Sequence, residues 1–534
     1  GPTGWRVAMD AAVGSISSAD LLALWPKSLV PPTREWLAEN VATGELRNVR
    51  SALRLVPKRP PRVELGYEFR GAEVRVLRTL PPVREGRGFA GITENKHTLM
   101  VEEGTLRAPS GGQIEVADSV MTVPDIREKP ARAEVKLVTR APVPAALALL
   151  DEEPFHFMSK AGLGTDIATG WAEARTRLRF QMKKRILTED VDFEVAARLT
   201  DVVSDRIVPG HKIAAPRLTL TADRAGMVIS GAGLFDIVPF QGRWSQRFGP
   251  EARGVSRVDG FVEVTPAALD HFRIALPKGA VRGEGWGSLV IDLHEGQPPA
   301  YRFASDLKGL VLSVPELGWS KGAPAAGRIE LAGHLGPVAT VERLKATAPG
   351  LSAEGRLQLS DKGFEKAIFG KLAVGSWFDG AVDLVGRGKG RVPDVVVHSG
   401  RLDLRKARFG GASGAGGGGG GGAPAKGGGN RIEARLDRLT VSGGIALAPF
   451  AGQFTTRGGF SGDFRGKVNG GPEVTGAVVP AKNGRAAVRI TGPDAGAALA
   501  AAGVFSKARG GTLDLTLMPV ETKSYDGRLA VSNL

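Results

Sequence analysis

The sequence predicts an all-β protein with a few short helices. Three observations carry this prediction: apolar and charged residues alternate, the alternating runs are short, and glycine is frequent, with 74 of 534 residues. The clearest alternation lies between Thr176 and Thr200, where two runs flank a polar turn. Their apolar positions are Leu178, Phe180, Met182, Val191, Phe193, Val195 and Leu199. A period of two is typical of strands, and glycine between such runs indicates turns.

Each of these two strands has one apolar face and one charged face. Arg177, Arg179 and Lys183 alternate with the apolar residues of the first run, and Asp192 and Glu194 with those of the second. Neighbouring strands must place their apolar residues on the same side of the sheet. The apolar side is then buried against another layer or filled by a ligand, and the functional interpretation depends on which of these holds.

Composition excludes several classes of protein. Apolar residues make up 42% and charged residues 24% of the chain, as in globular proteins, so general disorder is excluded. The net charge of +15 favours anionic partners, such as nucleic acid, an acidic polymer or phospholipid headgroups. The absence of cysteine rules out disulfides, zinc–thiolate sites and cysteine nucleophiles. The longest apolar runs are too short to span a membrane, and no secretory signal pattern stands at the start.

The order of elements predicts many strands and few helices. Short helices are expected near 18–41, 144–151 and 265–272, where serine, proline or Thr265-Pro266 provides a start signal. Strands are expected throughout the remainder, roughly thirty in all at this spacing. We expect four regions: 1–310 and 311–409 as continuous β-structure, 410–429 as a flexible glycine-rich loop, and 430–534 as a C-terminal β-region.

No enzymatic motif is present, so the sequence predicts a protein that is not an enzyme and needs no cofactor or metal. The densest carboxylate group is Glu189, Asp190, Asp192 and Glu194, and its alternation with apolar residues places it on an outward face. The seven histidines are dispersed, so a metal site would require long-range convergence. Gly386–Gly390 lacks the spacing of a phosphate-binding loop.

Basic clusters at Lys58-Arg59 and Lys183-Lys184-Arg185 raise the question of nucleic-acid binding. The cations alternate with acidic residues, and no aromatic-rich stacking strand accompanies them. A solvated sheet face is the preferred interpretation, and nucleic acid is not expected as a partner. The same charge also suits an anionic membrane surface.

The apolar face leads to two competing hypotheses. A long curled sheet encloses a trough whose apolar lining suits acyl chains; alternatively, the face closes on itself as a packed sandwich. The residues expected to line the trough are Leu178, Phe180, Met182, Val191, Phe193, Val195, Leu199, Leu218, Leu220, Leu289, Ile291 and Leu293. Alternation alone leaves both hypotheses open, and a register slip of one residue would invert this assignment.

Several segments, in order, resemble AsmA-like proteins of the YhdP type. The C-terminal block contains Asp494-Ala495-Gly496, then Arg509-Gly510-Gly511-Thr512-Leu513, and then a strand from Gly527 to Asn533. The N-terminal block contains Trp25-Pro26 and Pro31-Pro32-Thr33-Arg34-Glu35-Trp36-Leu37. The resemblance is scattered over nearly the whole chain.

This resemblance implies an elongated, curled antiparallel sheet that forms a U-shaped hydrophobic groove. It implies a non-enzymatic protein of the Gram-negative periplasm, anchored in the inner membrane, that carries phospholipids between the inner and outer membranes. We expect this chain to be a middle piece that lacks the N-terminal transmembrane helix and the C-terminal end. The competing functions are a structural or adhesive envelope protein with a closed core and, more distantly, a polysaccharide-active enzyme. Lipid identity, the direction of transport, its energy source and the oligomeric state do not follow from the sequence.

Overall fold

The fold of the chain is described from a computed structural model. The residues described are 5–27, 31–183, 186–272, 274, 276, 279–360, 363–388, 391–407, 429–481, 485–520 and 524–533. Strands account for 59% of the structure and helices for 10%, which confirms the predicted all-β class with a few short helices. Within the described residues, thirty strands belong to one curled sheet and three short strands form a second.

The chain divides into two compact units, Gly1–Arg257 and Val258–Leu534. The boundary expected at residue 310 falls inside the second unit. The glycine-rich loop expected at 410–429 lies outside the described residues except for Gly429.

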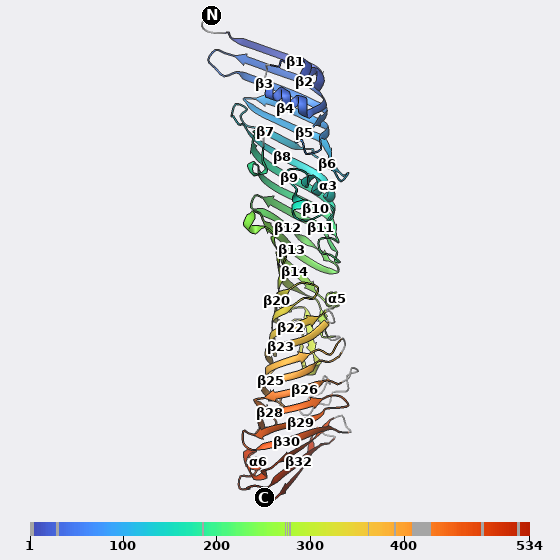
Figure 1. Cartoon of the computed structure of the whole chain (residues 1–534), viewed down its shortest axis with the longest axis vertical. Coiled ribbons are helices and arrows are strands. Elements are labelled where there is room, and N and C mark those ends of the chain that lie inside the picture. The colour runs from blue at the N-terminus through green and yellow to red at the C-terminus, as the bar shows by residue number, and fades with distance from the viewer. Residues whose placement is uncertain are drawn as a thin grey trace. The chain divides into compact units, whose positions relative to one another are not determined.

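The first unit is a succession of antiparallel strands, each paired with the next along the chain (Figure 1). Its strands are β1 (Val7–Ser17), β2 (Val41–Leu55), β3 (Arg62–Val74), β4 (Val83–Thr93), β5 (Lys96–Arg107), β6 (Gln113–Glu115), β7 (Ser119–Val123), β8 (Arg132–Pro142), β9 (Thr169–Gln181), β10 (Asp192–Ser204), β11 (Ile213–Asp223), β12 (Gly226–Phe235) and β13 (Val238–Arg247). The short strands β6 and β7 together fill the place of one strand between β5 and β8. This succession is the one that period-two patterning favours, because each hairpin needs only a short turn.

The helices of the first unit interrupt the connections at one end of the strands. They are α1 (Ser18–Leu24), α2 (Pro31–Asn40), α3 (Val143–Leu150) and α4 (Phe157–Lys160), with single 3₁₀ turns η1 (Thr188–Asp190) and η2 (Pro250–Ala252) elsewhere. The hydroxyl of Ser17 accepts a hydrogen bond from the Asp20 amide at 3.1 Å and so caps α1. A proline in its first turn begins α3. We call the end of the strands that carries α1 to α4 the helix end, and the opposite end the turn end.

The second unit repeats the same antiparallel construction. Its strands are β14 (Val255–Val264), which begins at the division, β15 (Val281–Gly283), β16 (Gly285–His294), β17 (Ala300–Ser305), β18 (Leu310–Val314), β19 (Trp319–Lys321), β20 (Arg328–His334), β21 (Val341–Ala348), β22 (Leu351–Ser360), β23 (Gly363–Val374), β24 (Phe378–Val385), β25 (Asp394–Asp403), β26 (Arg431–Leu436), β27 (Arg438–Thr440), β28 (Ala446–Thr455), β29 (Ser461–Val468), β30 (Glu473–Pro480), β31 (Ala486–Gly492), β32 (Thr512–Pro519) and β33 (Tyr525–Ser532). Its helices are α5 (Pro266–His271) and α6 (Ala495–Ala501), with the turn η3 (Pro315–Leu317). The threonine hydroxyl of Thr265 caps α5, and the Asp494 carboxylate caps α6.

One feature of the second unit corrects the expectation of a purely antiparallel sheet. Strand β25 pairs in parallel with β26 and with β27, and Val397 lies opposite Ala434. A parallel pair requires the chain to return to the starting end of the first strand. The connection between β25 and β26 contains the glycine-rich tract. The alternation of residues in the two flanking strands does not indicate whether those strands run parallel or antiparallel.

Candidate functional site

Across β3 to β13, the strand registers place no aspartate, glutamate, lysine or arginine on one face of the first unit's sheet. On β2, the register with β1 continues the same row from Leu53 and Val49 to Arg47 and Glu45. Leu178 lies opposite Val135 of β8 and opposite Phe193 of β10, so one apolar row crosses three strands. The rows continue through Val195, which faces Thr176 and Ala222. The uncharged face, as we name it, includes Val7, Met9, Leu53, Val63, Leu65, Tyr67, Ile92, His97, Leu99, Met121, Val135, Leu137, Leu178, Phe180, Phe193, Val195, Leu199, Leu218, Leu220, Met227, Ile229, Phe240 and Trp244.

The opposite face carries the ion pairs, and we call it the charged face. Arg179 contacts Asp192 and Glu194 at 3.2 Å, and Arg177 contacts Glu194 at 3.1 Å. These side chains are 42–53% exposed, so each pair contributes little to stability. Of the four carboxylates considered in the sequence for catalysis, Asp192 and Glu194 therefore lie on this solvated face and bind arginines of β9. The other two, Glu189 and Asp190, lie in the turn η1, where Asp190 contacts Lys183 at 3.1 Å.

The uncharged face is only partly buried. Leu178, Phe180, Phe193, Val195 and Leu220 are all of intermediate exposure, whereas the two sides of a packed sandwich would exclude water from such residues. Strands of this unit make their extensive contacts with hydrogen-bonded neighbours and with helices, and no second sheet packs extensively on the face within the described residues. Half-burial here reflects the curl of a single sheet.

The helix end of the first unit is closed by small buried clusters. In one, Ala145 and Ala148 of α3 pack on Ile114 and Ala141. In the other, Val143 packs with Ala168 and Val202. The turn end has no such cover in the described part of the unit, and apolar side chains such as Met9 and Val63 are exposed there. The face is thus closed at the helix end around α3, while α1 and α2 bury no residue, and it is accessible at the turn end.

The structure brings most of the predicted lining residues of the first unit together. Those on the uncharged face in consecutive strands are Leu178, Phe180, Phe193, Val195, Leu199, Leu218 and Leu220. Two others lie outside the paired strands: Met182 follows the end of β9 and is 46% exposed, and Val191 precedes β10. The register thus keeps the phase that the alternation predicts.

The second unit carries an uncharged face of its own. Leu289 of β16 lies opposite Phe303, which lies opposite Leu331, and Leu331 faces Leu344 of β21. Ile291 faces Tyr301 one row away, and the third predicted residue, Leu293, is half-buried near the end of β16. Further along, a large buried cluster closes one side of this unit, built around Trp319, Trp377, Phe378, Leu447, Phe450 and Leu513.

Sequence reasoning missed two titratable residues on the first unit's uncharged face, His97 and Tyr67. His97 lies between Ile92 and Val123 in its row, and burial lowers the pKa of its imidazole. Burial also raises the pKa of the Tyr67 phenol. Both shifts favour the neutral side chain, as expected in an apolar environment. The signal was in the sequence, because His97 is in phase with Leu99 and Val101.

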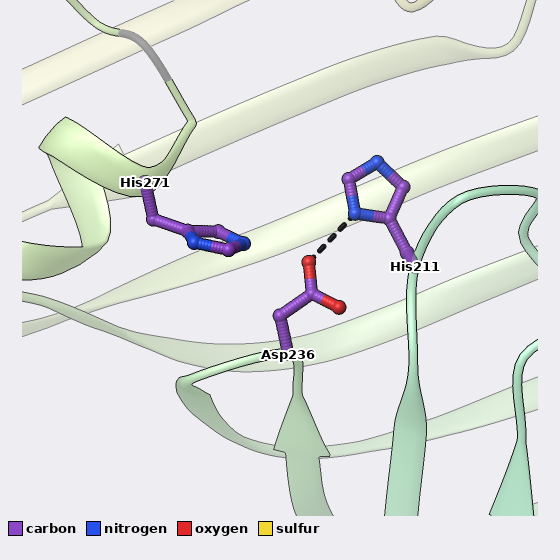
Figure 2. Close-up of side chains that lie close together, drawn as sticks. All are labelled: His211, Asp236 and His271. Atoms are coloured by element: carbon purple, nitrogen blue, oxygen red, sulfur yellow. Dashed lines mark hydrogen bonds and ion pairs between the residues drawn. The ribbon is translucent and has the colours of Figure 1, made fainter.

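The first unit also contains a histidine–carboxylate pair that the sequence does not reveal, because its members are 25 residues apart. Nδ1 of His211 lies 2.7 Å from Oδ2 of Asp236, a contact marked by the dashed line in Figure 2. The other carboxylate oxygen of Asp236 accepts a hydrogen bond from the Lys212 amide at 2.7 Å, and the His211 ring stacks on Phe235. His271, drawn in the same view, belongs to the second unit. The pair joins the β10–β11 connection to the turn between β12 and β13 at the helix end.

Comparison with known proteins gives no match: no protein-family model, no curated protein and no solved structure corresponds to this chain. Among the described residues, no helix is both long enough and apolar enough to cross a membrane. The features that bear on function are therefore the two uncharged faces and their partial burial.

Proposed function

We propose that this chain carries the acyl chains of phospholipids along its uncharged faces, as a non-enzymatic lipid-transfer bridge. One observation supports the proposal most strongly: uncharged side chains form continuous rows across neighbouring strands, and these side chains are only partly buried. A face that is uncharged but still accessible is suited to a hydrocarbon ligand, because such a ligand needs apolar contact and exclusion of water, with few directional bonds.

The dimensions of the first unit fit this use. Twelve strand positions at about 4.8 Å each extend the uncharged face by roughly 50 Å in the stacking direction. One leaflet of a bilayer has a hydrocarbon thickness of about 15 Å, half of a core of roughly 30 Å. The face has room for several lipids in series. Each methylene kept from water contributes about 0.8 kcal/mol, so a continuous lining lowers the barrier to leaving a bilayer.

The lipid headgroup would lie at the accessible turn end, where it can contact water. With the helix end sealed by α3, the acyl chains would lie on the apolar rows and the headgroups would point toward the side without cover. We extend the proposal to the setting that the AsmA-like resemblance implies: the periplasm of a Gram-negative cell, anchorage in the inner membrane, and transfer between inner and outer membranes.

A structural or adhesive envelope protein with a closed core is the second candidate, and the large buried cluster of the second unit favours it. That cluster joins residues such as Trp377 and Val374 whose side chains are buried. It occupies one side of the unit, however, while Leu289 and Ile291 stay half-buried. A sealed core predicts no bound lipid at all.

The test is to purify the protein from a Gram-negative host, wash it free of detergent, and extract it with organic solvent. The proposal predicts phospholipid in the extract at a fixed ratio to protein, detected by mass spectrometry. An extract that contains no phospholipid, from protein that is folded by circular dichroism, would favour the closed-core alternative.

A further inference from the structure

The sheet of the second unit also has a charged face, opposite its uncharged face, and side chains of β25, β26, β28 and β29 enclose a hollow on it. Its volume is about 330 Å³, and its floor is the small side chain of Ala451 on β28. The register places Arg435 of β26 directly opposite Ala451 on one side and Arg465 of β29 directly opposite on the other. A methyl group between two long cationic side chains leaves the space between them open. Lys467 and His398 also line the hollow.

Two of the three permanent cations of this hollow are outside ion pairs. Arg465 and Lys467 are exposed, and within the part of the chain that the structure describes neither has a carboxylate within ion-pair distance. The third cation, Arg435, contacts Glu433 at 3.1 Å. Two carboxylates, Asp437 and Glu473, also line the hollow, and Glu473 lies opposite Lys467 in the register of β29 and β30.

His398 joins the hollow to a buried carboxylate beneath it. Its Nε2 atom lies 3.0 Å from Oδ2 of Asp383, which also binds Lys366 at 2.8 Å. Asp383 is only 7% exposed, so this contact holds the imidazole in place from behind. The far side of the ring is left to the hollow, beside Arg435. The site therefore combines one fixed side chain with two arginines on β26 and β29, the strands on either side of β28.

We propose that this hollow binds a phosphate group, either free or as a monoester or diester. Guanidinium groups that flank a hollow from two sides match a tetrahedral anion, because its several oxygens accept hydrogen bonds from both at once. A carboxylate, with two coplanar oxygens, is satisfied by one arginine alone. The hollow leaves room for the organic part of an ester. This inference is independent of the proposed lipid transfer, since it concerns the opposite face of the sheet.

The experiment titrates the whole protein with inorganic phosphate and with glycerol 3-phosphate by calorimetry, with chloride added to keep the ionic strength constant. Arg465→Gln and Arg435→Gln are expected to weaken binding at least tenfold. Arg356→Gln is the matched control: it removes one exposed cation from the charged face of β22, away from the hollow, and should leave binding unchanged. Thermal unfolding midpoints verify that each variant is folded.

A second arm distinguishes the sources of phosphate. Binding to vesicles of phosphatidylglycerol, compared with vesicles of phosphatidylcholine, is measured for the same variants. Loss of vesicle binding in Arg465→Gln but not in Arg356→Gln identifies a lipid headgroup as the ligand, and loss of binding to the small phosphates alone identifies a soluble one. The proposal is overturned if neither phosphate nor vesicles bind, or if the control weakens binding as much as Arg465→Gln does.

Discussion

At the scale of single residues, the buried carboxylate Asp383 links charge to stability in the second unit. Burial acts to raise the pKa of Asp383, but the hydrogen bonds from Lys366 and His398 outweigh burial and leave the pKa below its ordinary value. The ionised form is therefore favoured by folding. Its contribution is present above the unfolded-state pKa of about 4 and is lost as the pH falls through the folded-state value.

Replacing Asp383 by asparagine should cost roughly 1–2 kcal/mol at pH 7, because Lys366 and His398 are partly exposed and can turn toward water. The difference in the free energy of unfolding between wild type and Asp383→Asn should shrink as the pH falls below about 4 and through the lowered folded-state pKa of Asp383. Urea midpoints at pH 7 and at a series of pH values below about 4 measure this difference. A difference that stays constant with pH would show that Asp383 does not titrate as inferred.

Lys321 is a second residue whose environment no sequence pattern indicates. It is 2% exposed, and its Nζ donates to the carbonyl oxygens of Leu307, Leu310 and Gly322 at 2.6, 2.8 and 3.1 Å. One ammonium thus joins β19 to the loop before β18. A lysine is rarely buried, so a sequence reading assigns it to the surface.

We expect Lys321→Met to destabilise the second unit by roughly 2–4 kcal/mol, since three buried carbonyl groups lose their donor. Lys308→Met serves as the control, because Lys308 is 65% exposed and pairs only with Asp306 at 3.8 Å. Denaturant unfolding followed by tryptophan fluorescence reports on the nearby Trp319. Equal, small effects of both substitutions would contradict the structural role of Lys321.

At the scale of elements, glycines beneath aromatic rings set the packing of the uncharged faces. A Cβ atom at Gly287 of β16 would meet the Phe303 ring of β17 at 2.2 Å. The ring therefore lies over the glycine of the neighbouring strand, which explains how a large side chain fits against the sheet.

Gly287→Ala should displace the Phe303 ring and destabilise the protein by roughly 1–3 kcal/mol. Gly370→Ala in β23 is the control, because a Cβ atom there meets nothing within 4 Å. Thermal unfolding midpoints compare the two. The explanation fails if the alanine at 287 is tolerated as well as the alanine at 370.

The elements themselves were largely predictable from local signals. The two strands around residue 185 follow from period-two alternation, and the helices α1, α3 and α5 follow from their serine, proline and threonine start signals. The three-residue strands β6, β15, β19 and β27 are too short for a period to show. The direction of β26 relative to β25 depends on a connection whose glycine-rich sequence carries no directional signal. The alignment of Arg435, Ala451 and Arg465 depends on the registers of β26 with β28 and of β28 with β29, which no local sequence pattern fixes.

At the scale of the molecule, the central question is whether the uncharged faces serve a ligand or a core. Local alternation placed seven of the predicted lining residues of the first unit on one face, as the strand registers do. It did not distinguish a packed sandwich from an open face, because both give the same alternation. In the first unit, strand pairing and the partial burial of these side chains favour the open face over the packed sandwich, and both observations require the folded structure.

A charge on an open face and a charge in a sealed core have different consequences. Phe193→Asp should leave the protein folded, because water reaches this side chain, and should reduce co-purified phospholipid severalfold. Ala196→Asp is the matched control: it lies three residues away on the exposed charged face, opposite Arg175 and Thr221, and should change neither property. Outright unfolding of Phe193→Asp would identify that residue as core.

The most direct measurement is photo-crosslinking in living Gram-negative cells, with benzoylphenylalanine placed at Phe193 and at Ala196, and in the second unit at Ile291 and at Val290. Each pair samples the two faces of one strand. We predict phospholipid adducts, identified by mass spectrometry, at Phe193 and Ile291, and none at Ala196 and Val290. Adducts in equal yield on both faces, or none at Phe193 and Ile291, would contradict the account.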